Sequence, residues 1–108
     1  MTDELARRLG QLSGVWNIVP TPFHPDEELD LDSLRTLTDF VVGSGVDGMT
    51  ILGVLGEGAK VTDSERSAII DITLAQAHGR VPICVTVSAA SGFRAVAFAR
   101  EARKAGAH

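Results

Sequence analysis

Tyrosine is absent from this sequence of 108 residues, and the other aromatic residues are one tryptophan and four phenylalanines. A hydrophobic core built from this chain must therefore be mostly aliphatic, and a proton relay through phenols is excluded within it. The single cysteine, Cys84, excludes an internal disulfide and fits a reducing compartment. Because Cys84 lies in an apolar run, we expect a buried and unreactive thiol.

Long apolar runs and a surplus of basic residues are also missing. No run approaches the roughly 18 residues that a membrane-spanning helix needs, so we expect no membrane span. The formal net charge is -4, which excludes a basic surface that could hold nucleic acid. The acidic start, residues 1–4, lacks the apolar stretch of a secretory leader, and we expect a cytoplasmic protein.

The three histidines give no indication of a metal site. His24, His78 and His108 lie far apart in the sequence and fall in a predicted loop, at a helix end and at the last position. Closely spaced ligands are typical of metal sites, and none occur here. We therefore expect surface histidines, no bound metal and no cofactor.

What the sequence does contain is a regular alternation of predicted strands and helices. Residues 1–13 are polar with leucines at helical spacing, and they are predicted to form an N-terminal arm or short helix. Residues 14–108 follow as one unit of three strand–helix pairs. The strands are predicted at 14–19, 48–52 and 83–87, and the helices at 31–43, 63–79 and 93–105.

The helix boundaries carry capping signals. Asp30 and Ser91 are suitable N-caps, because their side-chain oxygens can accept hydrogen bonds from free backbone N–H groups. Thr62 and Glu65 have the spacing of a capping box. Glycines close each helix, as is common at C-termini. The run 83–87 is apolar at nearly every position, which indicates a parallel strand buried on both faces.

Strands that alternate with helices predict an α/β fold with a parallel sheet. In such folds functional groups collect at the carboxyl ends of the strands, where the loops 20–23, 53–60 and 88–92 are expected. The middle loop, Gly-Val-Leu-Gly-Glu-Gly-Ala-Lys, is the richest of the three in glycine and has a lone acid. From its residues alone it is a plain turn, a phosphate cradle or one wall of an active site.

The position of the lysine disfavours the phosphate cradle. A Walker A loop requires G-x-x-x-x-G-K-[ST], and Gly53 and Gly58 do have this spacing. Ala59, however, stands where the lysine belongs, and Lys60 comes one position late. The dinucleotide-binding pattern G-x-G-x-x-G is absent as well. Against the plain turn stands Glu57, because a turn needs no carboxylate between two glycines.

Several stretches, taken in order, carry a resemblance to a known family. They are 14–23 (Gly-Val and then Thr-Pro-Phe), 29–34, 44–57 (Ser-Gly-Val-Asp-Gly leading into Gly-Val-Leu-Gly-Glu), 61–66, 79–83 and 102–107. Together they resemble the N-terminal part of the dihydrodipicolinate synthase / N-acetylneuraminate lyase family, which are pyruvate-dependent class I aldolases. The resemblance implies the first three βα units of a TIM (β/α)8 barrel. The barrel is incomplete in this chain, since a whole one needs about 250 residues.

The resemblance also assigns substrate binding to the loop at 53–57. In the family this loop reads G-x-x-G-E, usually with Ser or Thr in the middle, and its amides and hydroxyls hold the carboxylate of pyruvate. Here Gly53, Val54, Leu55, Gly56 and Glu57 would form this wall. Val54 and Leu55 carry no hydroxyl, so only their backbone N–H groups could bind a carboxylate.

For three residues the sequence allows more than one role. Thr21 and Ser88 are candidate substrate-binding residues, although a turn-capping role suits both. Glu57 either takes part in acid–base catalysis or, as we favour, braces the loop by accepting backbone N–H bonds.

The family's catalytic residues are not expected within this chain. The resemblance implies a Schiff-base lysine on a later strand and a tyrosine after the fourth strand, whereas this chain has only Lys60 and Lys104 and no tyrosine. Both groups are therefore expected beyond residue 108. We therefore expect this chain to be the N-terminal part of a lyase. The whole enzyme would form a lysine Schiff base with pyruvate or another 2-keto acid, for aldol cleavage or condensation.

That fragment is expected to be inactive alone and, as in the family, to belong to a homo-oligomer, often a tetramer. The first alternative is a non-catalytic α/β module that binds a small carboxylate or assembles with itself. The second is a complete flavodoxin-like domain, which three predicted strands and the missing phosphate loop disfavour.

Overall fold

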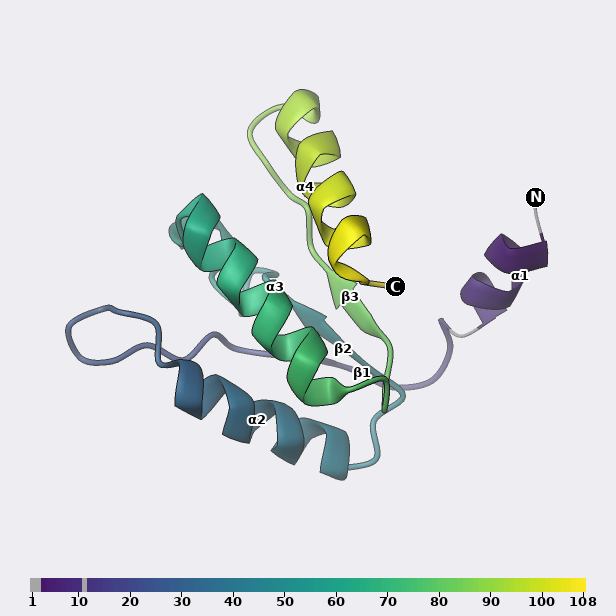
Figure 1. Cartoon of the computed structure of the whole chain (residues 1–108), viewed down its shortest axis with the longest axis horizontal. Coiled ribbons are helices and arrows are strands. Elements are labelled where there is room, and N and C mark those ends of the chain that lie inside the picture. Colours follow the sequence, from purple (N-terminus) through teal and green to yellow (C-terminus); the bar gives the residue numbers. More distant parts are fainter. Residues whose placement is uncertain (1–2, 11) are drawn as a thin grey trace.

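The computed structural model describes residues 3–10 and 12–108, and it consists of three parallel strands with helices packed along them (Figure 1). The order is α1 (Asp3–Gly10), β1 (Trp16–Ile18), α2 (Leu31–Gly43), β2 (Gly48–Ile51), η1 (Gly58–Lys60), α3 (Asp63–Ala77), β3 (Ile83–Val85) and α4 (Gly92–Ala105). The predicted alternation of three strands with three helices is therefore confirmed. The 3-10 turn η1, within the loop after β2, was not predicted.

β2 is the central strand of the sheet, which has the order β1-β2-β3 with both pairs parallel. Met49 of β2 pairs with Asn17 on one side and with Ile83 on the other. Because all three strands run in the same direction, their carboxyl ends lie at one edge of the sheet. The three loops singled out in the sequence leave from this edge.

The capping signals in the sequence correspond to real helix boundaries. The side chain of Asp30 accepts a hydrogen bond from the Ser33 N–H at 3.0 Å, at the start of α2. At the start of α3, Thr62 N–H donates to the Glu65 carboxylate at 2.8 Å, and Glu65 N–H donates to the Thr62 hydroxyl at 3.2 Å. Ser91 caps α4 by accepting a hydrogen bond from the Arg94 N–H at 3.2 Å. All three caps, the capping box included, are confirmed.

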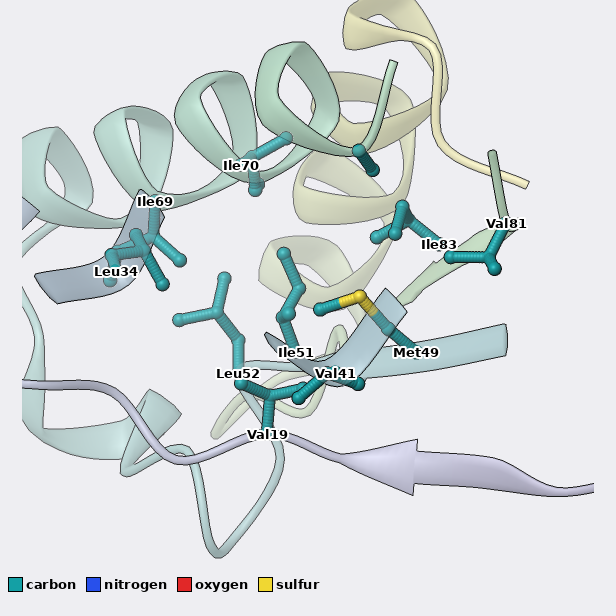
Figure 2. Packing of buried hydrophobic residues seen from close by; sticks show 11 residues of the cluster. Val19, Leu34, Val41, Met49, Ile51, Leu52, Ile69, Ile70, Val81 and Ile83 are labelled. Atoms are coloured by element: carbon teal, nitrogen blue, oxygen red, sulfur yellow. The ribbon is translucent and has the colours of Figure 1, made fainter. Parts of the chain in front are cut away.

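The core lies between the sheet and the helices and is aliphatic, as expected (Figure 2). Met49 and Ile51 of β2 are almost fully buried, and they pack beneath Ile69 and Ile70 of α3. The other members of the cluster are Val19, Leu34, Val41, Leu52, Ala77, Val81 and Ile83. Met49 and Ile51, two positions apart on β2, point to the same layer because side chains alternate along a strand, whereas Val19, Leu52 and Val81 enter the core from the segments next to the strands.

The opposite face of the sheet is open, and this corrects two predictions. Cys84 is exposed, not buried, and Ile83 is the single buried residue of β3. Ile18 of β1 is likewise 51% exposed. Successive side chains of a strand point to opposite faces, and the described helices cover one of them. The apolar run 83–87 is therefore buried on one face in this chain, although the sequence indicated both.

The N-terminal segment, predicted to be either an arm or a short helix, forms the short helix α1. Within α1, Glu4 pairs with Arg7 and Arg8 at 2.8 and 2.9 Å, both at the surface. Figure 1 shows α1 apart from the layer of α2, α3 and α4. The side chains of Leu5 and Leu9 lie outside the described part of the chain. Among the helices that the structure describes, none is long and apolar enough to cross a membrane.

Candidate functional site

The loop that follows β2 is a compact turn held by its own backbone. Gly58 N–H donates to the Gly53 carbonyl and Glu57 N–H donates to the Val54 carbonyl, each at 3.1 Å. The chain enters and leaves the turn through left-handed conformations at Leu52 (φ 60°) and Glu57 (φ 55°). Non-glycine residues adopt this region rarely, and such strain concentrates at functional sites.

Two glycines let this turn lie directly on the backbone of Leu52. A side chain at Gly56 would place its Cβ 2.9 Å from the Leu52 nitrogen and 3.1 Å from the Val19 carbonyl oxygen. A Cβ at Gly58 would overlap the Leu52 carbonyl oxygen outright. Both positions therefore require glycine because of close backbone approach, not because of a positive φ.

The turn leaves a row of backbone donors without partners. Within residues 3–10 and 12–108, the amide N–H groups of Gly53, Val54, Leu55 and Gly56 donate to no acceptor. The side chain of Val54 is 99% exposed and that of Leu55 is 56% exposed, so neither covers the donors by packing into the core. Consecutive free N–H groups in a turn form a concave site that suits an anion.

Thr21 is hydrogen-bonded to this turn, whereas Ser88 makes no hydrogen bond to it among the described residues. The Thr21 hydroxyl donates to the Gly56 carbonyl at 2.6 Å and so ties the loop after β1 to the loop after β2. Its proton is thereby committed to the protein. Ser88 is exposed in the loop after β3, and no hydrogen bond to its hydroxyl exists among the described residues. Of the two candidates, Thr21 belongs to the frame of the site.

Glu57 does not brace the loop in the expected way. Its side chain is half-buried, but its carboxylate accepts no hydrogen bond from the described residues. The backbone bonds of the turn and the Thr21 hydroxyl hold the loop in place instead. Lys60, at the end of η1, is exposed. The bracing role is therefore not found.

A residue that the sequence interpretation missed, Thr86, lies at the carboxyl edge beside the loop that follows β2. Its hydroxyl oxygen is 3.5 Å from the position that a Cβ on Gly53 would occupy, and Ile18 Cγ2 is 3.8 Å from the same point. Thr86 follows β3 and is half-buried. It was missed because strand ends are set by tertiary pairing, and the sequence drew attention to the small-residue loop at 88–92.

Arg66 fixes the main chain at Thr86 from the helix side. Its side chain is 3% exposed, its Nη2 donates to the Thr86 carbonyl at 2.5 Å, and its guanidinium lies 4.1 Å from the centre of the Phe98 ring. Burial lowers the pKa of Arg66, although Glu101 and Asp63 oppose the shift. An arginine remains charged even so, and a cation on an aromatic face is a favourable contact. The hydrogen bond and stacking join α3, β3 and α4.

The histidines do not gather at this edge. Within the described residues no group of three potential ligands is close enough to hold a metal ion. His24 lies 3.6 Å from Asp30 at the surface, and His78 ends α3. His108 accepts a hydrogen bond from Ile83 N–H through Nδ1 at 3.2 Å. No histidine of the described residues is therefore assigned to the site at the carboxyl edge, which offers backbone amides, hydroxyls, apolar side chains and the Glu57 carboxylate.

Three parallel strand–helix pairs with such loops at one edge are the first three βα units of a TIM (β/α)8 barrel, as predicted. A model of the Dihydrodipicolinate synthetase family matches residues 11–108. The chain belongs to this family, and the resemblance seen in the sequence is confirmed.

Individual relatives agree with this membership. The 4-hydroxy-tetrahydrodipicolinate synthase of Azoarcus sp. (strain BH72) is 39% identical over 89 residues, which are 82% of this chain and 30% of the relative. The pyruvate complex of the chloride-inhibited dihydrodipicolinate synthase of Acinetobacter baumannii has a TM-score of 0.86 at 25% identity, covering 89% of this chain and 33% of that one.

The N-acetylneuraminate lyase of Mycoplasma synoviae shares the fold. Its TM-score is 0.85 at 20% identity, over 92% of this chain and 34% of that one. The chain spans about a third of the length of the curated relatives it matches. This third of the family fold includes the loop at 53–60.

Proposed function

We propose that this chain supplies the N-terminal part of a lyase in which a lysine forms a Schiff base with pyruvate or another 2-keto acid, for aldol cleavage or condensation. The observation that carries the proposal is the row of unpartnered amide N–H groups at 53–56. Fixed backbone donors bind a carboxylate without the cost of reorganising at each turnover. The pyruvate complex of the Acinetobacter relative supports the choice of ligand.

In this proposal the loop orients the substrate, and other parts of the protein perform the chemistry. The amides of Gly53 to Gly56 hold the carboxylate, which presents the keto carbon to a lysine amine. Attack by the amine and loss of water give an imine, which withdraws electrons from the neighbouring carbon. The lysine and a catalytic tyrosine are proposed to lie beyond residue 108, so the 108-residue chain alone is inactive.

A second candidate function has one observation in its favour. Among the described residues, the face of the sheet that carries Ile18, Thr50 and Cys84 is largely open, since Ile18 is 51% exposed, Cys84 is exposed and Thr50 is half-buried. An open apolar sheet face favours association with another surface. The alternative is therefore a non-catalytic α/β module that binds a small carboxylate or assembles with itself. Homo-oligomerisation of the whole protein stays part of both proposals.

Ligand binding tests the role of the loop. The ¹⁵N-labelled chain is titrated with pyruvate and, as a matched control, with pyruvamide, which keeps the keto group but lacks the carboxylate. Pyruvate should shift the amide resonances of residues 53–56 in a saturable way, and pyruvamide should not. Equal shifts with both compounds, or no shift with pyruvate, would contradict carboxylate binding by these amides.

Borohydride reduction with pyruvate separates the enzyme proposal from its alternative. Reduction would trap an imine as a stable adduct, which intact mass detects. The 108-residue chain should gain no adduct, and a longer protein that continues through the later strands should gain one. An adduct on the short chain that disappears in the Lys60→Arg variant would show that the nucleophile lies in η1. No adduct on the longer protein would support the non-catalytic module.

A further inference from the structure

The proposed carboxylate site lacks a side-chain hydroxyl of its own. Val54 and Leu55 occupy the middle of the loop and offer backbone donors alone. The Thr21 hydroxyl already donates to the Gly56 carbonyl, so its proton is not available to a ligand. Ser88 is exposed in the next loop. Any hydroxyl hydrogen bond to a ligand held by the amides at 53–56 must therefore come from another residue.

The Thr86 hydroxyl meets this requirement by its position. Alternation along β3 puts Ile83 in the core and Cys84 on the open face, so Thr86, two residues later, points to the open face as well. Its oxygen is 3.5 Å from the place of a Cβ on Gly53. Because Gly53 has no side chain, that residue leaves the space in front of the hydroxyl unfilled.

The main chain around Thr86 is held on both sides, which fixes the place from which its side chain leaves the backbone. Its N–H donates to the Ile51 carbonyl of β2 at 3.1 Å, and its carbonyl accepts from buried Arg66 at 2.5 Å. The hydroxyl itself has no hydrogen-bond partner among the described residues, and it is not among the buried unsatisfied groups. A preorganised, accessible and unpartnered donor is suited to a ligand.

We propose that Thr86 is a further substrate-binding residue, whose hydroxyl donates a hydrogen bond to an oxygen of the 2-keto acid held by the amides at 53–56. The inference rests on the proposed function, since the ligand is the same. In this arrangement the backbone of the loop after β2 and one side chain after β3 bind the substrate together. Ile18, on the third side of the same space, supplies an apolar wall.

Binding by isosteric variants tests the proposal. Thr86→Val removes the hydroxyl but keeps the shape, and Thr86→Ser keeps the hydroxyl. Thr50→Val is the matched control, because Thr50 is half-buried on the same face and pairs with Cys84, two residues before Thr86. The dissociation constant for pyruvate is measured on each ¹⁵N-labelled chain from the amide resonances of 53–56, whose positions without ligand also report whether the loop is intact.

A hydrogen bond to a charged ligand group corresponds to about a ten- to hundredfold change in affinity. Thr86→Val should raise the dissociation constant by that factor, while Thr86→Ser and Thr50→Val should stay close to the parent chain. If the parent chain and the Thr86→Val variant bind pyruvate equally well, the role of Thr86 is overturned, while the proposed function stands. A parent chain that does not bind pyruvate would overturn this inference and the proposed function together.

A second variant covers the case in which Thr86→Val does not fold. Gly53→Ala would place a methyl group at ordinary contact distance from the Thr86 hydroxyl, 3.5 Å away, and from Ile18, 3.8 Å away. The fold should therefore tolerate it, while the space in front of the hydroxyl is filled. Its dissociation constant for pyruvate should rise by about tenfold or more. Unchanged affinity in a folded Gly53→Ala chain would contradict binding in that space.

Discussion

Gly58→Ala is the substitution whose effect follows most directly from the geometry of the loop. The new Cβ would overlap the Leu52 carbonyl oxygen and lie 2.9 Å from its carbon and 3.3 Å from its Cα. All three atoms belong to the backbone, so no side chain can rotate away. Leu52 is also buried, at 3% exposure, and already holds a left-handed conformation. Relief therefore requires moving the end of β2 or detaching the turn.

The expected cost of this overlap is at the upper end of the range for overpacking, about 3 kcal/mol. For a domain of this size that corresponds to a fall in Tm of roughly 12 °C or more. Circular dichroism during thermal unfolding measures it. The hydrogen bond from Gly58 N–H to the Gly53 carbonyl should be lost too, and amide hydrogen exchange at residue 58 should become faster.

Gly53→Ala is the control, because it adds the same methyl group to the same loop. Its Cβ would meet no atom nearer than 3.5 Å. Its Tm should therefore stay within a few degrees of the parent value, and a small rise is consistent with lower entropy of the unfolded chain. If Gly58→Ala and Gly53→Ala changed Tm equally, close backbone approach would not be the reason for glycine at position 58.

Two further substitutions test the capping and the charge interactions. Thr62→Ala removes the acceptor for Glu65 N–H and should cost about 1 kcal/mol, read from chemical denaturation; no loss of stability would contradict the capping box. Asp39 has a lowered pKa because Gln76 and Arg80 hydrogen-bond to its carboxylate, so its contribution to stability is present above the unfolded pKa and disappears as pH falls through the folded pKa. Asp39→Asn should therefore lower Tm at neutral pH and leave it unchanged in acid, whereas a pH-independent difference would refute the assignment.

The helices were predictable because their signals are local. The N-cap oxygen of Asp30, the capping box at Thr62 and Glu65, and the glycine at 106 act on backbone groups within a few residues of themselves. The periodic apolar residues of α2 point to one side for the same reason. The existence and approximate bounds of α2, α3 and α4 therefore followed from short stretches read independently.

The predictions that failed depend on which residues lie close in space to a strand or loop. Cys84 lies in an apolar run, and its exposure depends on whether anything covers the open face of β3. Glu57 looked suited to bracing the loop, yet the Thr21 hydroxyl and backbone bonds do so. Thr86 drew no attention, because nothing adjacent to it in sequence indicates its distance from Gly53. Contacts between residues about thirty positions apart leave no local signal.

The α/β class, the approximate bounds of the helices and the family could be predicted from the sequence, because they depend on periodicity, capping chemistry and the order of short motifs. The tertiary structure alone decided which groups meet at the carboxyl edge. Parallel pairing of β2 with β3 brings Thr86 beside Gly53, and the buried Arg66 holds it there. Register between strands arises from packing across the whole sheet, so the composition of one loop does not contain it.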